Sequence, residues 1–245
     1  MPRMNRPTAP AEKDSTNAKL LVARAAVKLI QSGMTVGLGS GSTATLFIQE
    51  LGRAIEAGTL NSIVGIPTSQ ESERLARSVG IAVGDFSSRE RCDITVDGAD
   101  EIDNRLDCIK GLGGALLREK LVAQNSEKLV IIVDHSKRVP KLCTKGPLPI
   151  EVTPFGLAAH DRFLRSLGAT PKLRMAKDGG APYLTDNGNH IFDCRFDAGL
   201  LDARLFALRV QERAGIVEHG LFLSMVSTLL STTSDGRVET FGKKS

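Results

Sequence analysis

The stretch from Ile94 to Lys120 gathers the residues of this chain whose chemistry is easiest to recognise. An apolar segment, Ile94–Val96, runs directly into the acidic sequence DGADE, which begins at Asp97. Lys110 and a glycine-rich turn follow, and then a helical pattern that carries Glu119. Carboxylates, a lysine and glycines at two strand-to-helix junctions suit proton transfer on a small anionic substrate.

Glu119 has unusual neighbours for a glutamate. At about 100° per residue, the positions within about 60° of it on the helix are all apolar; they are Ala115, Leu116, Val122 and Ala123. A surface glutamate is the common case. The apolar arc instead indicates a partly desolvated carboxylate with a raised pKa, as a general base requires.

The sequence GLGSGST, residues 37–43, lies between a predicted strand and a predicted helix. Backbone N–H groups and the helix dipole favour an anion at such a junction, and the hydroxyls of Ser40, Ser42 and Thr43 suit a phosphate monoester. It is not a P-loop, because G-x-x-x-x-G-K is absent, and Ser42 stands where a dinucleotide motif has its third glycine. A plain turn with a hydroxyl cap is the structural alternative.

Asp97 to Asp100 also has alternatives, a structural turn or a divalent-cation site, although the alternating calcium pattern is absent. The four histidines and four cysteines show no spacing typical of metal ligands. We therefore predict neither a metal nor a cofactor. Scattered cysteines in a chain of this length indicate reduced thiols and the cytoplasm.

Composition excludes several broad classes of protein. The 245 residues are 41% hydrophobic and 24% charged, which is typical of a soluble globular protein. A net charge of +4, with no tryptophan and one tyrosine, argues against nucleic acid as a partner. No apolar run approaches the ~18 residues of a membrane span. The proline-rich, polar residues 1–17 indicate a disordered leader rather than a signal peptide.

Strand and helix patterns alternate through the first part of the chain. We expect strands at 34–38, 62–66, 81–83, 94–96 and 129–133, and helices at 19–30, 44–57, 71–79 and around Glu119. This alternation predicts a Rossmann-like, doubly wound and mostly parallel sheet. Four of the strands end in the polar sequences SGST, PTS, DGADE and DHSK. Ligands bind outside the carboxyl ends of such strands, so these sequences are expected to meet at one crevice.

The pattern changes after residue 146. Strands at 150–152, 171–175 and 191–195 and helices at 157–167 and 201–213 indicate a smaller α+β unit. The apolar segment 221–230 and the segment 238–241 are expected to return to the main sheet. We therefore predict one domain of residues 18–146 plus 220–245 and a second, small α+β domain of residues 147–219.

GLGSGSTA, PTS, TVDGADEID, KGLGGALLREK, DHSK and LPIEV occur in that order. This succession resembles ribose-5-phosphate isomerases of the A type over about residues 19–152, and the later TDNGNHIFD and SDGRVETF also fit. The resemblance implies a metal-independent aldose–ketose isomerase, commonly a homodimer or homotetramer. It would interconvert ribose 5-phosphate and ribulose 5-phosphate through a cis-enediolate, in the non-oxidative pentose phosphate pathway.

The resemblance also implies roles for individual residues. Glu119 would accept the proton, and the substrate contacts would be Ser40, Gly41, Ser42, Thr43, Asp97, Gly98, Ala99, Asp100, Lys110, Gly111, Leu112, Gly113 and Lys137. Four positions depart from the family pattern. Ser40 and Leu117 stand where threonine is common, Leu112 replaces a usual glycine, and His135 is unusual between its neighbours.

The chemistry of the reaction assigns roles to the remaining charged groups. Lys110 would stabilise the enediolate oxygen, and Asp97 would handle hydroxyl protons during ring opening, with Asp100 orienting the sugar hydroxyls. Lys137 and Lys19 would assist the phosphate loop. Two alternatives stay open: an amino-sugar phosphate isomerase or lactonase of a related fold, which would need a well-placed histidine, and a sugar-phosphate sensing module, which would need an attached DNA-binding segment.

Overall fold

The computed structural model describes the backbone of residues 10–242, with side chains from Ser15 onward. The first helix, α1, spans Pro10–Val27 and begins well before Lys19, where the helical pattern was expected. The predicted disordered leader is therefore helical over residues 10–17, because helix-forming Ala, Glu and Lys follow a proline that is tolerated in the first turn. Residues 1–9 of that leader lie outside the described residues.

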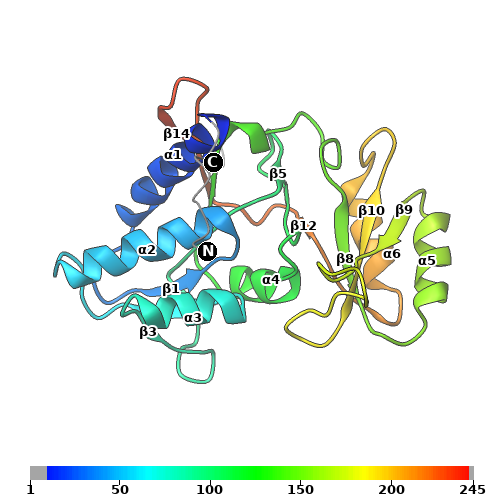
Figure 1. Ribbon diagram of the computed structural model, residues 1–245, viewed down its shortest axis with the longest axis horizontal. Coiled ribbons are helices and arrows are strands. Elements are labelled where there is room, and N and C mark those ends of the chain that lie inside the picture. Colours follow the sequence, from blue (N-terminus) through cyan, green and yellow to red (C-terminus); the bar gives the residue numbers. More distant parts are fainter. Residues whose placement is uncertain (1–9, 243–245) are drawn as a thin grey trace, which may run out of the picture.

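A seven-stranded sheet forms the centre of the larger part of the molecule (Figure 1). In spatial order its strands are β14 (Val238–Gly242), β13 (Thr228–Thr232), β7 (Leu129–Val133), β4 (Ile94–Asp97), β1 (Thr35–Leu38), β2 (Val64–Pro67) and β3 (Ala82–Val83). All neighbouring pairs are parallel except β13 with β14, which is antiparallel. The predicted mostly parallel sheet is confirmed.

Both faces of this sheet are covered, as the continuous apolar strands predict. Val130 and Ile132 of β7 belong to the hydrophobic cluster formed with α1 and with α2 (Ser42–Glu56). Ile131 and Val133 point to the opposite face, into a cluster that includes Ala123 of α4 (Leu116–Gln124). Helix α3 (Gln70–Ser78) contributes to the first cluster through Ala76.

A small three-stranded sheet accompanies α4 on the second face. It consists of β12 (Leu221–Phe222), β6 (Cys108–Ile109) and β5 (Glu101–Ile102), paired in that order. The sequence did not predict this sheet, since strands of two residues are too short to show a periodicity. β12 belongs to the segment 221–230 that was expected to return to the main sheet; only its later part, β13, does so.

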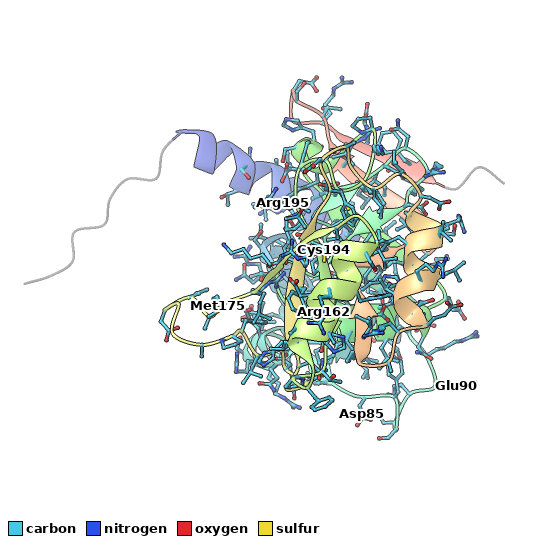
Figure 2. The ribbon with its side chains drawn as sticks, turned by 90° about the vertical axis from the view of Figure 1, so that its right-hand side faces the viewer. Asp85, Glu90, Arg162, Met175, Cys194 and Arg195 are labelled. Carbon is cyan, nitrogen blue, oxygen red and sulfur yellow. The ribbon has the colours of Figure 1, made fainter. Side chains whose placement is uncertain are left out.

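The second part of the molecule is built on a four-stranded antiparallel sheet in the order β11-β8-β10-β9 (Figure 1). Its elements are β8 (Leu148–Val152), α5 (Leu157–Ser166), β9 (Thr170–Leu173), β10 (His190–Arg195), α6 (Ala203–Gln211) and β11 (Ile216–His219). This matches the predicted α+β unit, with β11 added. In Figure 2, which faces this part, the loop around Met175 projects away from the sheet.

The strand order places the ligand crevice. Without β14, the parallel strands lie in the order β3-β2-β1-β4-β7-β13. Numbered along the chain, this is the Rossmann order 3-2-1-4-5-6. The chain connections diverge between β1 and β4, and ligands bind outside the carboxyl ends of the strands at such a point. The segment after Leu38 and the segment after Asp97 leave the sheet there. Within the described residues, no helix is long and apolar enough to cross a membrane.

Candidate active site

A cleft of about 100 Å³ opens at this divergence point. It is lined by residues from four separate loops and from α1, α2 and α4: Lys19, Ser40, Gly41, Ser42, Thr43, Gly98, Ala99, Asp100, Lys110, Gly111, Gly113, Glu119 and Lys137. Every residue that the sequence singled out for the site is among them, except Asp97 and Leu112. Lys137 comes from the 3-10 turn His135–Lys137 that follows β7.

Three buried charged side chains form an ion-paired cluster at the cleft, of which Lys110 and Glu119 line it. The Lys110 ammonium lies 2.8 Å from Oδ2 of Asp97 and 3.0 Å from Oε1 of Glu119, and it donates a third hydrogen bond, of 2.7 Å, to the Gly98 carbonyl. The exposed fractions of the three side chains are 1–5%. Oε2 of Glu119 is buried and has no partner within the described part of the chain. It is therefore the oxygen available to a bound molecule.

This arrangement perturbs the protonation of Glu119. Burial raises the pKa of its carboxyl group to about 8; Lys110 opposes the rise, and the negative charge of Asp97 adds to it. Burial would lower the pKa of Lys110, but the two carboxylates raise it above its ordinary value, so the ammonium stays charged. A carboxyl with a raised pKa beside a permanent positive charge is suited to accept a proton near neutral pH.

Asp97 lies beneath the cleft rather than in its wall, and both of its oxygens have partners. Oδ1 accepts hydrogen bonds from the backbone N–H groups of Ser40 and Gly98, at 3.0 and 2.7 Å. A side chain at Gly39 would meet the Asp97 Cα at 2.6 Å, so only glycine allows this approach of β1 to β4. Asp97 thus joins the two loops through Oδ1 and fixes Lys110 through the ion pair of its Oδ2.

The other end of the cleft has the features of an anion site. Helix α2 begins at Ser42, and no side chain caps its N-terminus, so the N–H groups of its first turn face the cleft. Lys19, from α1, donates a 3.1 Å hydrogen bond to Oγ of Ser42. Lys19 and Lys137 bring two positive charges to the hydroxyls of Ser42 and Thr43. These groups match the predicted phosphate loop.

Ser40 is oriented by hydroxyls that the sequence did not assign a role. Its Oγ lies 2.7 Å from Oγ1 of Thr68 and donates to Oγ of Ser69, at 2.8 Å. Thr68 in turn donates to the Leu38 carbonyl at the end of β1. The sequence PTS was recognised only as the polar end of a strand. Because β2 lies next to β1, its end supports the phosphate loop laterally.

The glycine-rich turn after Lys110 lies at the side of the cleft. The N–H of Leu112 donates a 2.9 Å hydrogen bond to Oδ2 of Asp100, and the Leu112 side chain is 40% exposed outside the cleft. Its bulk therefore leaves the cleft unobstructed, although the family pattern has glycine there. Arg174 and Tyr183, which the sequence did not single out, contact this turn from the segment between β9 and β10 of the four-stranded sheet, which is called the small sheet below.

Metal ligands are not gathered at the cleft. Among the described residues, no group of three or more His, Cys, Asp or Glu side chains is arranged to hold a metal ion. The nearest cation to the carboxylates is the Lys110 ammonium. His135, which follows β7, is exposed and does not line the cleft. Its backbone N–H donates a hydrogen bond to Oγ1 of Thr232.

The fold and the cleft define a class of protein: an α/β enzyme with an anion loop at one end of its site and a buried acid–base group at the other. The sequence matches the family model of ribose 5-phosphate isomerase A (phosphoriboisomerase A) over residues 64–236. The chain is 48% identical to ribose-5-phosphate isomerase A of Deinococcus radiodurans over 86% of its own length and 91% of that protein. Identity to the Desulfatibacillum aliphaticivorans protein of the same name is 48%, over 89% and 94% of the two chains.

Solved structures agree with these relatives. Ribose 5-phosphate isomerase from Plasmodium falciparum superimposes with a TM-score of 0.90 at 38% identity, covering 94% of this chain and all of that one (100%). A D-ribose-5-phosphate isomerase in complex with phospho-erythronic acid gives 0.89 at 35% identity, over 92% and 97% of the two chains. The chain belongs to the ribose 5-phosphate isomerase A family.

Proposed function

We propose that this enzyme interconverts ribose 5-phosphate and ribulose 5-phosphate, and that Glu119 carries the proton. The observation that supports this most strongly is the unpartnered Oε2 of Glu119, buried at a cleft whose other end is lined by Lys19, Lys137 and the first turn of α2. Family membership supports the same substrate pair.

The proposed reaction begins with removal of the C2 proton of open-chain ribose 5-phosphate by Oε2 of Glu119. Negative charge then develops on the carbonyl oxygen and gives a cis-enediolate. Lys110 supplies the compensating charge, and the enediolate oxygen replaces one of the three acceptors of its ammonium. A hydroxyl proton then passes from O2 to O1 of the enediolate, and return of the proton from Glu119 to C1 gives ribulose 5-phosphate, so no net charge or atom is gained.

Two other carboxylates have different proposed roles. Asp97 was expected to handle hydroxyl protons during ring opening, but it does not line the cleft; its Oδ1 accepts two backbone hydrogen bonds and its Oδ2 is paired with the Lys110 ammonium. We propose instead that it holds Lys110 charged and in place. Asp100 does line the cleft and is proposed to orient the sugar hydroxyls.

The phosphate is proposed to bind at the first turn of α2, with Ser42, Thr43, Lys19 and Lys137. The uncapped helix N-terminus and the two lysines support this assignment. One of the similar structures holds phospho-erythronic acid, a phosphorylated compound. We also propose the pentose phosphate pathway as the metabolic setting.

Three further expectations remain proposals. The separate sheets and hydrophobic clusters support a division into residues 18–146 plus 220–245 and residues 147–219. All four cysteines are free and buried, which supports a reducing compartment such as the cytoplasm. A homodimer or homotetramer is proposed from the resemblance to the family.

The test is formation of ribulose 5-phosphate from ribose 5-phosphate by purified protein in excess chelator. Activity should persist in chelator, and ribose without the phosphate should be a far poorer substrate. Absence of turnover with normal binding of ribose 5-phosphate would instead favour a sensing module, and turnover of an amino-sugar phosphate alone would favour the related isomerases.

A further inference from the structure

The glycine-rich turn beside the catalytic lysine is held by a side chain from the other part of the molecule. Arg174, which follows β9 in the small sheet, donates from Nη1 to the carbonyls of Gly111 and Leu112, at 3.2 and 3.0 Å. Two successive carbonyls of the turn are therefore bonded to one guanidinium. Gly111 lines the substrate cleft, so this contact reaches the edge of the active site.

Arg174 is itself firmly oriented. Its other nitrogens donate to both oxygens of Asp193 on β10, at 2.9 and 2.5 Å. The guanidinium lies 5.7 Å from the centre of the Tyr183 ring, and only 13% of the side chain is exposed. A planar donor held in this way by a carboxylate loses little further freedom when it binds two carbonyls.

The Tyr183 ring packs against the same turn. A Cβ at Gly114, whose φ is +88°, would lie 2.3 Å from Oη of Tyr183. Glycine is therefore required there for two reasons, the backbone conformation and the approach of the ring. The Tyr183 hydroxyl is 3.5 Å from the Gly113 carbonyl, the limit of a hydrogen bond. This hydroxyl therefore holds the turn much less strongly than the Arg174 guanidinium does.

Binding these carbonyls fixes where the amide groups point. In a trans peptide the carbonyl oxygen and the following N–H point in opposite directions. The bond from Arg174 to the Leu112 carbonyl therefore turns the Gly113 N–H away from the small sheet. Within the described residues this N–H has no partner, and Gly113 lines the cleft. It is thus available to an oxygen of a bound sugar.

We propose that Arg174 is a positioning residue that holds the turn Gly111–Gly114 in the conformation that binds the sugar portion of the substrate. This inference rests on the proposed function for the identity of the substrate. It assigns to the small sheet a part in the active site, although the small sheet supplies no residue to the wall of the cleft.

The catalytic groups do not depend on Arg174 for their own positions. The backbone N–H of Lys110 is bonded to the Gly220 carbonyl at 2.9 Å, and β6 before it pairs with β12. Glu119 is carried by α4. Loss of Arg174 should therefore loosen the turn while Lys110 and Glu119 stay in place, so substrate binding should suffer more than the chemical step.

The experiment compares Arg174→Met and Arg174→Lys with a control, Arg165→Met. Arg165 forms an ion pair with Asp161 on α5, a helix that belongs to the same part of the molecule as Arg174, and it does not contact the turn. KM and kcat for ribose 5-phosphate are measured for each protein. Amide hydrogen exchange of the peptide that contains residues 111–114 is measured without substrate, together with thermal unfolding.

Arg174→Met should raise KM at least ~10-fold, since charged donors to two carbonyls are lost, and kcat should change by only a few fold. Amide exchange at residues 111–114 should accelerate. Arg174→Lys, which keeps the charge near Asp193, should raise KM less than Arg174→Met does. Arg165→Met should leave KM and the amide exchange at residues 111–114 at parent values. If Arg174→Met folds poorly, the lysine variant carries the test, with a smaller rise in KM.

Two results would overturn the proposal. One is an unchanged KM with unchanged exchange at residues 111–114. The other is a fall in kcat alone that matches a loss of thermal stability, because partial unfolding removes active enzyme without altering KM. A parent protein without isomerase activity would contradict the proposed function instead; the exchange measurement would then still decide whether Arg174 holds the turn.

Discussion

At the scale of single residues, the proposed chemistry depends on the protonation of Glu119. The sequence could predict its burial, because the residues on the same arc of the helix are apolar, and its side chain is buried in the structure. The ion pairs with Lys110 and, through it, Asp97 could not be predicted, since they join a helix, a loop and the end of a strand. A strand-end carboxylate that points under the cleft has the same local sequence as one that points into it.

The pH dependence of kcat/KM follows from this carboxyl group. Burial raises the pKa of Glu119 to about 8, and the base must be ionised to accept a proton. We expect kcat/KM for ribose 5-phosphate to rise with pH and to level off above about pH 8, because kcat/KM reports the free enzyme. A profile that is flat from pH 5 to pH 9, roughly the range in which this group titrates, would contradict the assignment.

The same pKa makes a prediction about stability. Between the ordinary glutamate pKa of 4.5 and about 8, the folded protein binds this proton and the unfolded chain does not. The free energy of unfolding contributed by Glu119 must therefore fall as pH rises through this window. Glu119→Gln lacks this dependence, so the variant should become more stable relative to the parent from about pH 5 to about pH 8.

Urea unfolding of both proteins across this window measures the difference. A constant difference, or one of opposite sign, would show that the carboxyl group has no raised pKa in the folded protein. Burial also raises the pKa of Asp97, and this residue is present in both proteins.

At the scale of elements, the site is made by strand ends and the helices that follow them. Local sequence indicates such junctions well, because glycines and hydroxyls after an apolar run mark the end of a strand. It does not indicate which strands are neighbours. The support that Thr68 and Ser69 give to Ser40 depends on β2 lying beside β1, and this is a property of the sheet order.

The phosphate assignment belongs to this scale. Replacing both Ser42 and Thr43 by Ala removes two hydroxyls at the first turn of α2. Each hydrogen bond to a charged group contributes about 1.5–3 kcal/mol, so KM for ribose 5-phosphate should rise by at least ~10-fold. A control, Ser78→Ala near the C-terminal end of α3, should leave KM unchanged. An unchanged KM in the double variant would show that the phosphate binds elsewhere.

At the scale of the whole molecule, the two larger sheets are joined at α4. Lys120 of α4 is buried and donates to Oε1 of Glu218, at 2.6 Å, and to the His219 carbonyl, at 2.5 Å, where β11 leads back to the larger part. The order and type of the small-sheet elements were predictable from periodicity, β11 excepted. Their contacts with the larger part, including those of Arg174, were not, because nothing in a local pattern encodes a contact across 60 residues or more.

Lys120→Met should therefore destabilise the protein strongly. It leaves the Glu218 carboxylate, whose side chain is only 15% exposed, without its cation, and breaking a buried pair in this way costs about 3–5 kcal/mol. Urea unfolding at neutral pH measures the loss. The double variant with Glu218→Gln should recover part of it; a double variant less stable than Lys120→Met would contradict the ion pair as the source.

The most direct test of the account is exchange of the C2 proton of ribose 5-phosphate with deuterated solvent, measured for the parent and for Glu119→Gln. The glutamine keeps the shape of the side chain but cannot accept a proton, so exchange and isomerisation should both fall by ~10²-fold or more. Binding of ribose 5-phosphate should persist, since the phosphate contacts come from other loops. Exchange near the parent rate in Glu119→Gln would contradict the account and move the base to another group, with Asp100 the remaining carboxylate in the cleft wall.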